Sequence, residues 1–413
     1  MDHGGPDPVA LRKALVDGLV AAGRVRSAAV ERAFRAVPRH LFLPGVDLDV
    51  AYADEAVPTR WDTEGRPTSS SSQPAIMAVM LEQLGLAPGQ RVLEIGAGTG
   101  YNAALLAELV GPAGAVVTVD IDADLVARAG EHLAAAGVAG VTVGCRDGAL
   151  GWAEGAPYDR IILTVGAWDL APAWREQLAP DGRIVLPLSL RGVQRSVAFE
   201  PAGDRLDSVS IADCGFMPLR GTMAEPGGSR PLGPAGLFVH VDDDRGLDPA
   251  ALLRALGRPG DTVPTGLRVR TSEVWGGLAL WLALREPALA RLSALGPAVG
   301  LGLVPDLIAF PGQVGTIALL AGTDLAALAR GDHPAGAPEP YELVARGYGP
   351  AGRDLADRLA AQVRGWDGAG RPASGELHIR AHPAGTDPSR LTGSIVDKRH
   401  TVLELHWTQP TNV

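Results

Sequence analysis

The residues best suited to chemistry lie in one short stretch, Arg91–Tyr101, which reads RVLEIGAGTGY. An apolar run containing Glu94 predicts a strand, glycines at alternate positions follow it, and a helical pattern begins directly afterwards. Glycines permit positive φ and let the backbone approach a ligand closely. Because the start of a helix leaves N–H groups unpaired, this stretch can hold a nucleotide-like ligand across a parallel sheet.

A second acidic residue, Asp120, ends the next predicted strand, 115–120. A carboxylate at that position can accept hydrogen bonds from two ribose hydroxyls, as in sites that bind NAD. The spacing here, Glu-x-Gly-x-Gly-x-Gly, is tighter than the NAD fingerprint and places an acid before the first glycine. It resembles the S-adenosylmethionine (SAM) site of class I methyltransferases. The alternative is a glycine-rich turn in some other α/β protein.

The elements that would position these residues alternate between strand and helix, which predicts an α/β fold with a doubly wound sheet. The expected strands are 91–95, 115–120, 141–145, 159–165 and 183–188. The expected helices between them are 100–110, 122–136 and 170–178. Two further strands, 193–200 and 206–213, would add an antiparallel edge. Two amphipathic helices within 8–36 and a helix at 75–86 precede the sheet.

A chain of 413 residues is long enough for two domains. We expect a SAM-binding domain at 1–221, a Pro/Gly-rich linker at 222–236 and a second domain at 237–413. The second domain should be α+β. Its expected helices are 248–257, 273–284 and 351–364. Its expected strands are 236–241, 307–310, 315–320, 341–346, 375–382 and 394–407.

Composition limits the partners. The net charge is −10 and we find no basic stripe, which argues against nucleic acid as a partner. The two cysteines, Cys145 and Cys214, have no metal-binding spacing and form no disulfide framework. We find neither a secretion signal nor an apolar run long enough to cross a bilayer. We therefore expect a cytoplasmic monomer that uses no metal and no membrane partner.

Several motifs, in order, resemble those of the protein-L-isoaspartate O-methyltransferases, and they cover about half of the chain. The motifs are VPRHLFLP followed by AYAD, SQPAIMAVMLEQL, VLEIGAGTGYNAALLAELVG, Arg146-Asp147-Gly148, YDRIILT and the segment Gln177–Pro187. The resemblance implies a class I (Rossmann-like) methyltransferase fold. It also implies an enzyme that transfers a methyl group from SAM to a carboxylate and leaves S-adenosylhomocysteine (SAH).

The same resemblance assigns the residues that bind the cofactor. They are Glu94, Gly96, Ala97, Gly98, Thr99, Gly100, Asn102, Asp120, Ile121, Asp147 and Gly148. The pair Asp147-Gly148 matches one that lies by the adenine in the family.

The acceptor chemistry determines which other residues matter. A carboxylate is already ionised near neutral pH, so transfer needs alignment and exclusion of water rather than a general base. Ser72 is the candidate catalytic residue, because its hydroxyl can donate to the acceptor carboxylate; its other possible role is N-cap of the next helix. The candidate substrate-binding residues are Arg60, Trp61, Ser71, Gln73, Thr164 and Val165. Arg60 and Arg66 could steer an anionic peptide or be solvated, and Trp61 could pack on the peptide or in the core.

Two departures from the repair enzymes bear on the substrate. The segment between AYAD and SQP, Glu55–Ser71, is longer than in the family, and the chain continues for nearly two hundred residues after the methyltransferase motifs. Both features resemble the actinobacterial subgroup of FxLD-system methyltransferases, which are encoded with pathways for ribosomally made peptides such as lanthipeptides or graspetides. That resemblance implies methylation of an Asp side chain in a modified, macrocyclic precursor peptide, followed by collapse to an aspartimide or isoaspartate.

Two alternatives remain open at this point. The first is a general isoaspartyl repair enzyme with an added domain. The second belongs to a different class, a SAM-binding regulator without turnover. A nucleic-acid methyltransferase is disfavoured, because Thr164-Val165-Gly166-Ala167 lacks the Asn/Asp-Pro-Pro-aromatic set that serves exocyclic amines.

Overall fold

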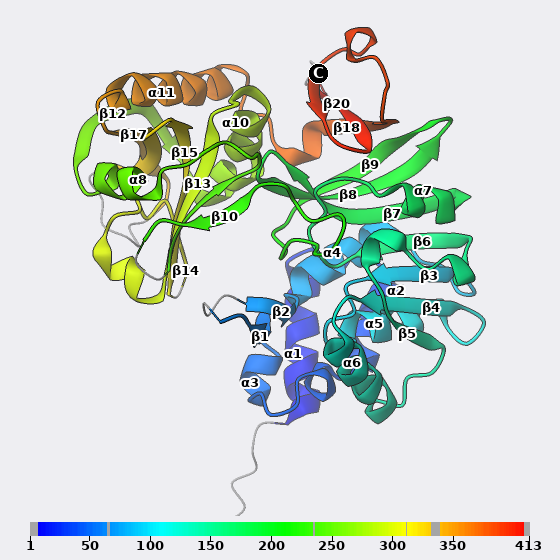
Figure 1. The fold of residues 1–413 in the computed structure, drawn as a ribbon. Coiled ribbons are helices and arrows are strands. Elements are labelled where there is room, and N and C mark those ends of the chain that lie inside the picture. Colours follow the sequence, from blue (N-terminus) through cyan, green and yellow to red (C-terminus); the bar gives the residue numbers. More distant parts are fainter. Residues whose placement is uncertain (1–6, 64–66, 234–235, 311, 332–338, 409–413) are drawn as a thin grey trace, which may run out of the picture.

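The computed structural model describes residues 7–63, 67–233, 236–310, 312–331 and 339–408. Within these ranges the chain forms a ten-stranded sheet, an eight-stranded sheet and a two-stranded hairpin (Figure 1). The predicted doubly wound α/β sheet is confirmed in the ten-stranded sheet. Within the same ranges, no helix has the length and apolar character needed to cross a membrane.

The ten-stranded sheet has a parallel centre and an antiparallel flank, with the spatial order β19-β20-β18-β9-β8-β7-β6-β3-β4-β5. Its parallel strands are β3 (Arg91–Ile95), β4 (Ala115–Asp120), β5 (Val141–Cys145), β6 (Tyr158–Leu163) and β7 (Leu178–Leu190). The antiparallel strands β8 (Val193–Ala202) and β9 (Arg205–Asp213) follow. The chain runs from β3 to β4 and β5 on one side, then crosses to β6 on the other. This reversal opens a crevice beyond the carboxyl ends of β3 and β6, where α/β sheets bind ligands.

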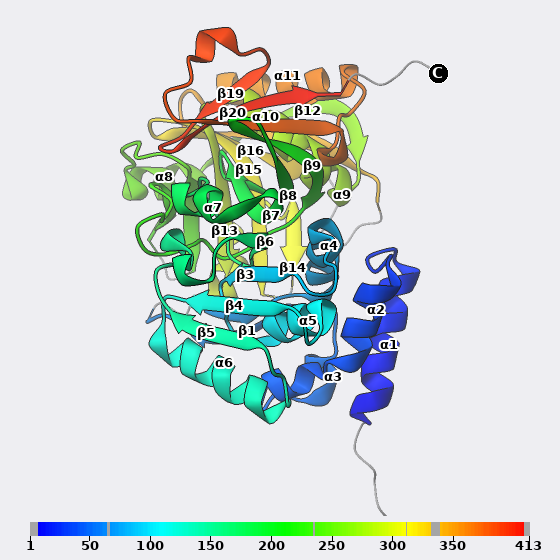
Figure 2. The same cartoon turned by 90° about the vertical axis from the view of Figure 1, so that its right-hand side faces the viewer.

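Helices cover both faces of the parallel strands, which is why consecutive residues of β3 are buried. Val92 packs in a core with Leu81 and Leu105, whereas its neighbour Leu93 packs in the opposite core with Trp174. The helices of this unit are α1 (Pro8–Ala21), α2 (Ala28–Ala36), α3 (Leu48–Ala51), α4 (Pro74–Leu84), α5 (Tyr101–Val110), α6 (Ala123–Ala135) and α7 (Pro172–Gln177). Figure 2 shows α1 and α2 side by side, on the same side of the strands as α4 and α5.

The eight-stranded sheet is antiparallel, with the order β10-β11-β13-β15-β16-β17-β12, and β14 pairs with β15. Its strands are β10 (Gly228–Pro231), β11 (Leu237–Val241), β12 (Pro259–Val269), β13 (Leu289–Leu295), β14 (Ile308–Phe310), β15 (Gln313–Ala321), β16 (Asp324–Arg330) and β17 (Tyr341–Tyr348). Its helices are α8 (Pro249–Leu256), α9 (Thr271–Glu273), α10 (Ala279–Arg285) and α11 (Gly352–Gly368). Helices α10 and α11 pack on one face of this sheet and α8 packs on the other.

The end of the chain leaves the second sheet and returns to the first. Strand β18 (Leu377–Pro383) pairs with β9, with Arg380 opposite Asp207, and β20 (Thr401–Trp407) and β19 (Ser394–Asp397) extend the same sheet. The expected single domain at 237–413 is therefore corrected to a domain that ends with α11. The return covers β9, which would otherwise be an open sheet edge, and buries Ile379 beside Leu206.

Several expected boundaries change because backbone pairing between strands outweighs the side-chain pattern of each segment. The expected linker 222–236 contains β10, and the expected strand 394–407 is a hairpin of β19 and β20. The Ser-rich stretch before α4 forms a second hairpin, β1 (Val57–Trp61) with β2 (Pro67–Ser71). The sequence pattern also misses β12, β13 and β16.

Candidate active site

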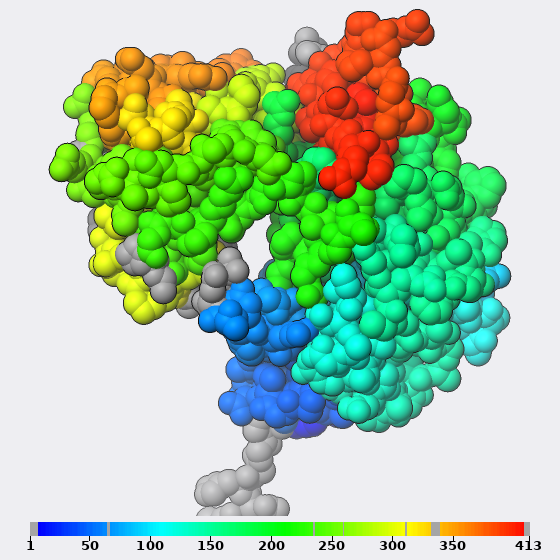
Figure 3. All heavy atoms as spheres, in the orientation of Figure 1, coloured from blue at the N-terminus to red at the C-terminus, as the bar shows by residue number. Residues whose placement is uncertain are grey.

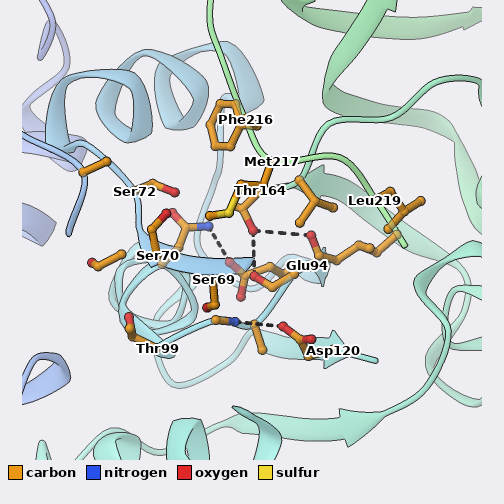
Figure 4. Close-up of a pocket in the computed structure, with 18 of the residues that line it drawn as sticks. Ser69, Ser70, Ser72, Glu94, Thr99, Asp120, Thr164, Phe216, Met217 and Leu219 are labelled. Carbon is orange, nitrogen blue, oxygen red and sulfur yellow. Dashed lines mark hydrogen bonds between the residues drawn. The ribbon is translucent and has the colours of Figure 1, made fainter. Parts of the chain in front are cut away.

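A cavity of about 260 Å³ lies at the carboxyl ends of β3, β4 and β6, in the crevice of the ten-stranded sheet (Figure 4). Its floor is the glycine turn after β3. Its walls come from hairpin β1–β2, the start of α4, the residues after β6 and the segment Asp213–Arg220. We call Asp213–Arg220 the strap. All of these segments belong to one chain.

The glycine turn has the conformation that its sequence predicts. Gly96, Gly98 and Gly100 have φ values of 105°, 51° and 85°, which other residues rarely adopt. The N–H groups of Gly96 and Ala97 both donate to the Val119 carbonyl, at 2.8 and 3.0 Å. A Cβ on Gly96 would stand 2.7 Å from Thr164 Oγ1. The turn is therefore fixed by its backbone and leaves room above it for a ligand.

Glu94 is fully buried at the bottom of the cavity. Burial raises the pKa of its carboxyl from 4.5 to about 7. Asn102 Nδ2 donates to Glu94 Oε1 at 2.8 Å, but Asn102 Oδ1 has no partner among the described residues. A hydrogen bond from Thr118 lowers the pKa of Glu94, so the Thr118 hydroxyl lies beside this carboxyl, and the clearest free acceptor is Asn102 Oδ1. A buried acceptor of this kind fits a ligand that brings its own N–H or O–H groups, as the amino acid and ribose parts of SAM do.

Asp120 ends β4 at the rim of the turn. Its Oδ2 accepts from Gly98 N at 3.1 Å and its Oδ1 accepts from Asp122 N at 3.3 Å. Burial raises the pKa of this carboxyl above its usual range. Each oxygen keeps a further lone pair, which suits two ribose hydroxyls.

The acceptor side of the cavity is built by the residues that precede α4. The N-cap of α4 is Gln73, and Asp54 Oδ1 accepts from Ala75 N at 2.8 Å. The second role considered for Ser72, N-cap of α4, is therefore wrong: Asp54 satisfies the start of the helix instead. Ser72 lines the cavity, and its hydroxyl has no hydrogen-bond partner in the described part of the chain.

Beyond the glycine turn, Thr164 Oγ1 donates to the Gly96 carbonyl at 2.7 Å and Val165 lies beside it. Of the sequence-predicted residues, fourteen line the cavity, and several appear in Figure 4. They are Ser71, Ser72, Gln73, Glu94, Gly96, Ala97, Gly98, Thr99, Asn102, Asp120, Ile121, Gly148, Thr164 and Val165.

Four predicted residues do not line it. Gly100 shapes the turn against Ala129. Asp147 accepts from Thr222 N at 2.8 Å and holds the chain just beyond the strap, while its neighbour Gly148 faces the cavity. Trp61 is 56% exposed at the end of β1. Arg60 is not free to steer a peptide, because it pairs with Asp122. Arg66 lies outside the described residues.

Asp122 joins two walls of the site. Arg60 Nη1 lies 2.6 Å from Asp122 Oδ2, and Arg220 Nη2 lies 2.5 Å from the same oxygen. The hydrogen bond from Arg220 holds the pKa of Asp122 below its usual range. Arg60 belongs to the hairpin and Arg220 to the strap, so this carboxylate ties both to the start of α6.

Sequence reasoning missed the strap. Its backbone is fastened at Gly166, which donates to the Met217 carbonyl and accepts from Leu219 N, each at 2.7 Å. Gln194 exchanges two more bonds with the backbone of Phe216. The strap has no periodic pattern, and its partners lie in other elements, so only its own Gly215 and Pro218 indicate an irregular segment.

The comparisons with known proteins agree with this geometry. Residues 10–224 match the family model described as protein-L-isoaspartate(D-aspartate) O-methyltransferase (PCMT). The chain belongs to this family. It is therefore a SAM-dependent carboxyl O-methyltransferase, and the alternative of a regulator without turnover is set aside.

Curated relatives match the same half of the chain. The protein-L-isoaspartate O-methyltransferase of Hyperthermus butylicus is 39% identical over 219 residues, which are 51% of this chain and 88% of that protein. The one from Roseiflexus sp. is 40% identical over 211 residues, 51% of this chain and 92% of that protein. A solved protein-L-isoaspartate O-methyltransferase covers 89% of this chain and 96% of its own, at 24% identity and a TM-score of 0.50. That likeness concerns the fold, and it extends beyond the methyltransferase motifs.

Proposed function

We propose that this enzyme methylates an Asp side-chain carboxylate in a constrained, ribosomally made peptide. The observation that carries the proposal is the acceptor wall: strands β1 and β2 form a hairpin that is tied to the strap through Asp122. A wall held in place by these contacts favours an acceptor peptide whose shape is already fixed. A cyclic peptide meets this condition, because it loses less conformational entropy on binding than a linear one.

The second candidate is repair of isoaspartyl residues in damaged proteins. It is favoured by the 39–40% identity to curated enzymes named for isoaspartate. The solved relative that covers 89% of this chain is also named for isoaspartate, so the extra length does not by itself point to peptide tailoring.

Both candidates use the same chemistry at the cavity. SAM, when bound, supplies a methyl group on a sulfonium that an ionised carboxylate oxygen can displace. The protein must align that oxygen and keep water away. An ionised carboxylate needs no general base to remove a proton before it attacks the methyl group. Ser72 is our candidate for holding the acceptor oxygen, with Thr164 and Val165 beside the turn.

The second sheet is our candidate for the rest of the peptide. Figure 3 shows an opening between hairpin β1–β2 and the second sheet. We propose that a modified precursor peptide lies there while one carboxylate enters the cavity. We also propose that the enzyme works as a monomer, because one chain builds the cavity.

Three peptides of one sequence separate the candidates: a ring-constrained Asp peptide, its linear form, and a linear isoaspartyl form. Each is incubated with enzyme and SAM and followed by mass spectrometry with hydroxylamine trapping. The carboxylate gains a methyl; attack by the next backbone nitrogen then expels methanol and closes the imide, a net loss of one water. The proposal expects this product from the ring-constrained peptide. Efficient methylation of the isoaspartyl peptide alone would contradict the proposal and favour the repair of isoaspartyl residues.

A further inference from the structure

Arg39, from the motif VPRHLFLP, is fully buried at the back of the acceptor wall. Its guanidinium donates only to neutral oxygens, and no carboxylate lies within ion-pair distance in the described part of the chain. The acceptors are the carbonyls of Ala51 (2.7 Å), Ala53 (3.1 Å), Glu55 (3.1 Å), Ser72 (3.1 Å) and Ser71 (3.5 Å), and Ser71 Oγ (3.5 Å). Nothing in the site described above gives this residue a role.

These bonds join two segments that are distant in sequence. One holds the AYAD motif, Ala51–Asp54, and the other is Ser71–Ser72, on the cavity wall. Asp54 reinforces the junction, because it also binds the start of α4 through Ala75 N. Arg39 therefore fixes the backbone that carries Ser72, opposite the glycine turn.

The charge of Arg39 has a second consequence. A guanidinium stays protonated in proteins. Arg195, which is also almost fully buried, has Asp213 at 3.1 Å as a counter-ion. Arg39 has no carboxylate at ion-pair distance in the described part of the chain, and the attraction of its charge to Asp54 acts from farther away. Its Nε has no hydrogen-bond partner among the described residues. The guanidinium lies directly behind the backbone of Ser71 and Ser72, which line the cavity. Its positive charge would attract a carboxylate in the cavity more strongly than a neutral amide.

We propose that Arg39 is the positioning and specificity residue of the acceptor site. It sets the backbone of Ser72 for the acceptor oxygen, and it supplies the positive potential that selects a carboxylate. The inference rests on the proposed carboxylate acceptor. In this chain Arg39 of VPRHLFLP donates to the carbonyls of Ala51 and Ala53 in AYAD, so it joins these two motifs.

Two variants separate the two roles. Arg39→Met removes the charge and the donors, whereas Arg39→Lys keeps the charge but offers three donors in place of five. The matched control is Arg160→Met, because Arg160 also donates to backbone carbonyls, those of Leu84 (2.9 Å) and Gly85 (3.4 Å), at the other end of α4. Calorimetry with SAH reports the cofactor site. Turnover of the best acceptor peptide, with its Asn analogue as competitor, reports the acceptor site.

We expect Arg39→Met to raise the KM for the peptide roughly tenfold and to remove the preference for acid over amide. The affinity for SAH should change by less than about twofold. Arg39→Lys should keep the preference and lose kcat, and Arg160→Met should do neither. If Arg39→Met does not fold, Arg39→Lys tests the inference alone. A lower kcat with an unchanged preference for acid over amide supports it, and a lost preference overturns it.

An acid-to-amide preference that is unchanged in Arg39→Met, or a fall in SAH affinity equal to the rise in KM, would overturn the inference and leave carboxyl methylation intact. A wild-type enzyme that methylates neither constrained Asp nor isoaspartyl peptides would overturn the proposed acceptor, and this inference with it. The two failures are therefore distinguishable.

Discussion

Replacing Glu94 by Gln should remove a pH dependence of stability that the structure assigns to this carboxyl. Burial raises its pKa from 4.5 to about 7 in the folded protein. Between these values the folded state keeps a proton that the unfolded state has released. The stabilisation is therefore fully present below pH 4.5 and is lost as the pH rises through about 7. The shift corresponds to about 3 kcal/mol in the free energy of unfolding.

The assay is urea unfolding of the wild type and Glu94→Gln between about pH 4.5 and about pH 8. Gln keeps an oxygen that can accept from Asn102 Nδ2 and has nearly the same shape. The difference between the two proteins should therefore change with pH, with the wild type losing about 3 kcal/mol relative to the variant. Glu108→Gln, on the exposed face of α5, is the control for removing one surface carboxylate. Parallel curves for wild type and Glu94→Gln would refute the assignment.

Three further outcomes are expected. Asp120→Ala should weaken SAH binding at least about tenfold in calorimetry, because it removes charge-assisted bonds to the ribose; unchanged affinity would mean that the site is misplaced. Gly96→Ala should abolish SAH binding, since its Cβ would meet Thr164 Oγ1 at 2.7 Å in a backbone with φ 105°; binding within about twofold of wild type would contradict the strain. A chain cut after Gly221 should lose its cooperative thermal transition, because the cut removes β18 from the edge of β9; a cooperative transition in circular dichroism would contradict this.

The cofactor half of the site is predictable because local sequence encodes it. Strand, glycine turn and helix are adjacent in the chain, and residues with a Cβ rarely adopt the positive φ of Gly96, Gly98 and Gly100. Asp120 follows from the same logic, since the carboxyl ends of neighbouring parallel strands meet at one edge of the sheet.

The acceptor half is less predictable, because backbone pairing and contacts from other elements build it. Pro67–Ser71 has no apolar alternation, yet it becomes β2 by pairing with β1, with Ser71 opposite Val57. The strap is held by Gly166 and Gln194, which lie in other elements. Arg39 looks like a surface residue in the sequence, and only the gathered carbonyls of remote segments explain its burial.

The predicted second domain, 237–413, is too long for a related reason. The strands after α11 match the local pattern of a second domain, and nothing near them indicates that β18 pairs with β9. Such non-local pairing is a property of the folded chain, and sequence periodicity does not record it.

The central claim is that a methyl group passes from SAM to a carboxylate held between the glycine turn and the acceptor wall. The most direct measurement uses SAM with an isotopically labelled methyl group and the ring-constrained and isoaspartyl peptides. The labelled product is then exposed to mild base or to hydroxylamine. We expect label that is released from the peptide as methanol, and at limiting SAM roughly tenfold less labelled peptide with Asp120→Ala than with the wild type. Label that stays on the peptide through base treatment would show methylation of nitrogen, sulfur or carbon, and would contradict it.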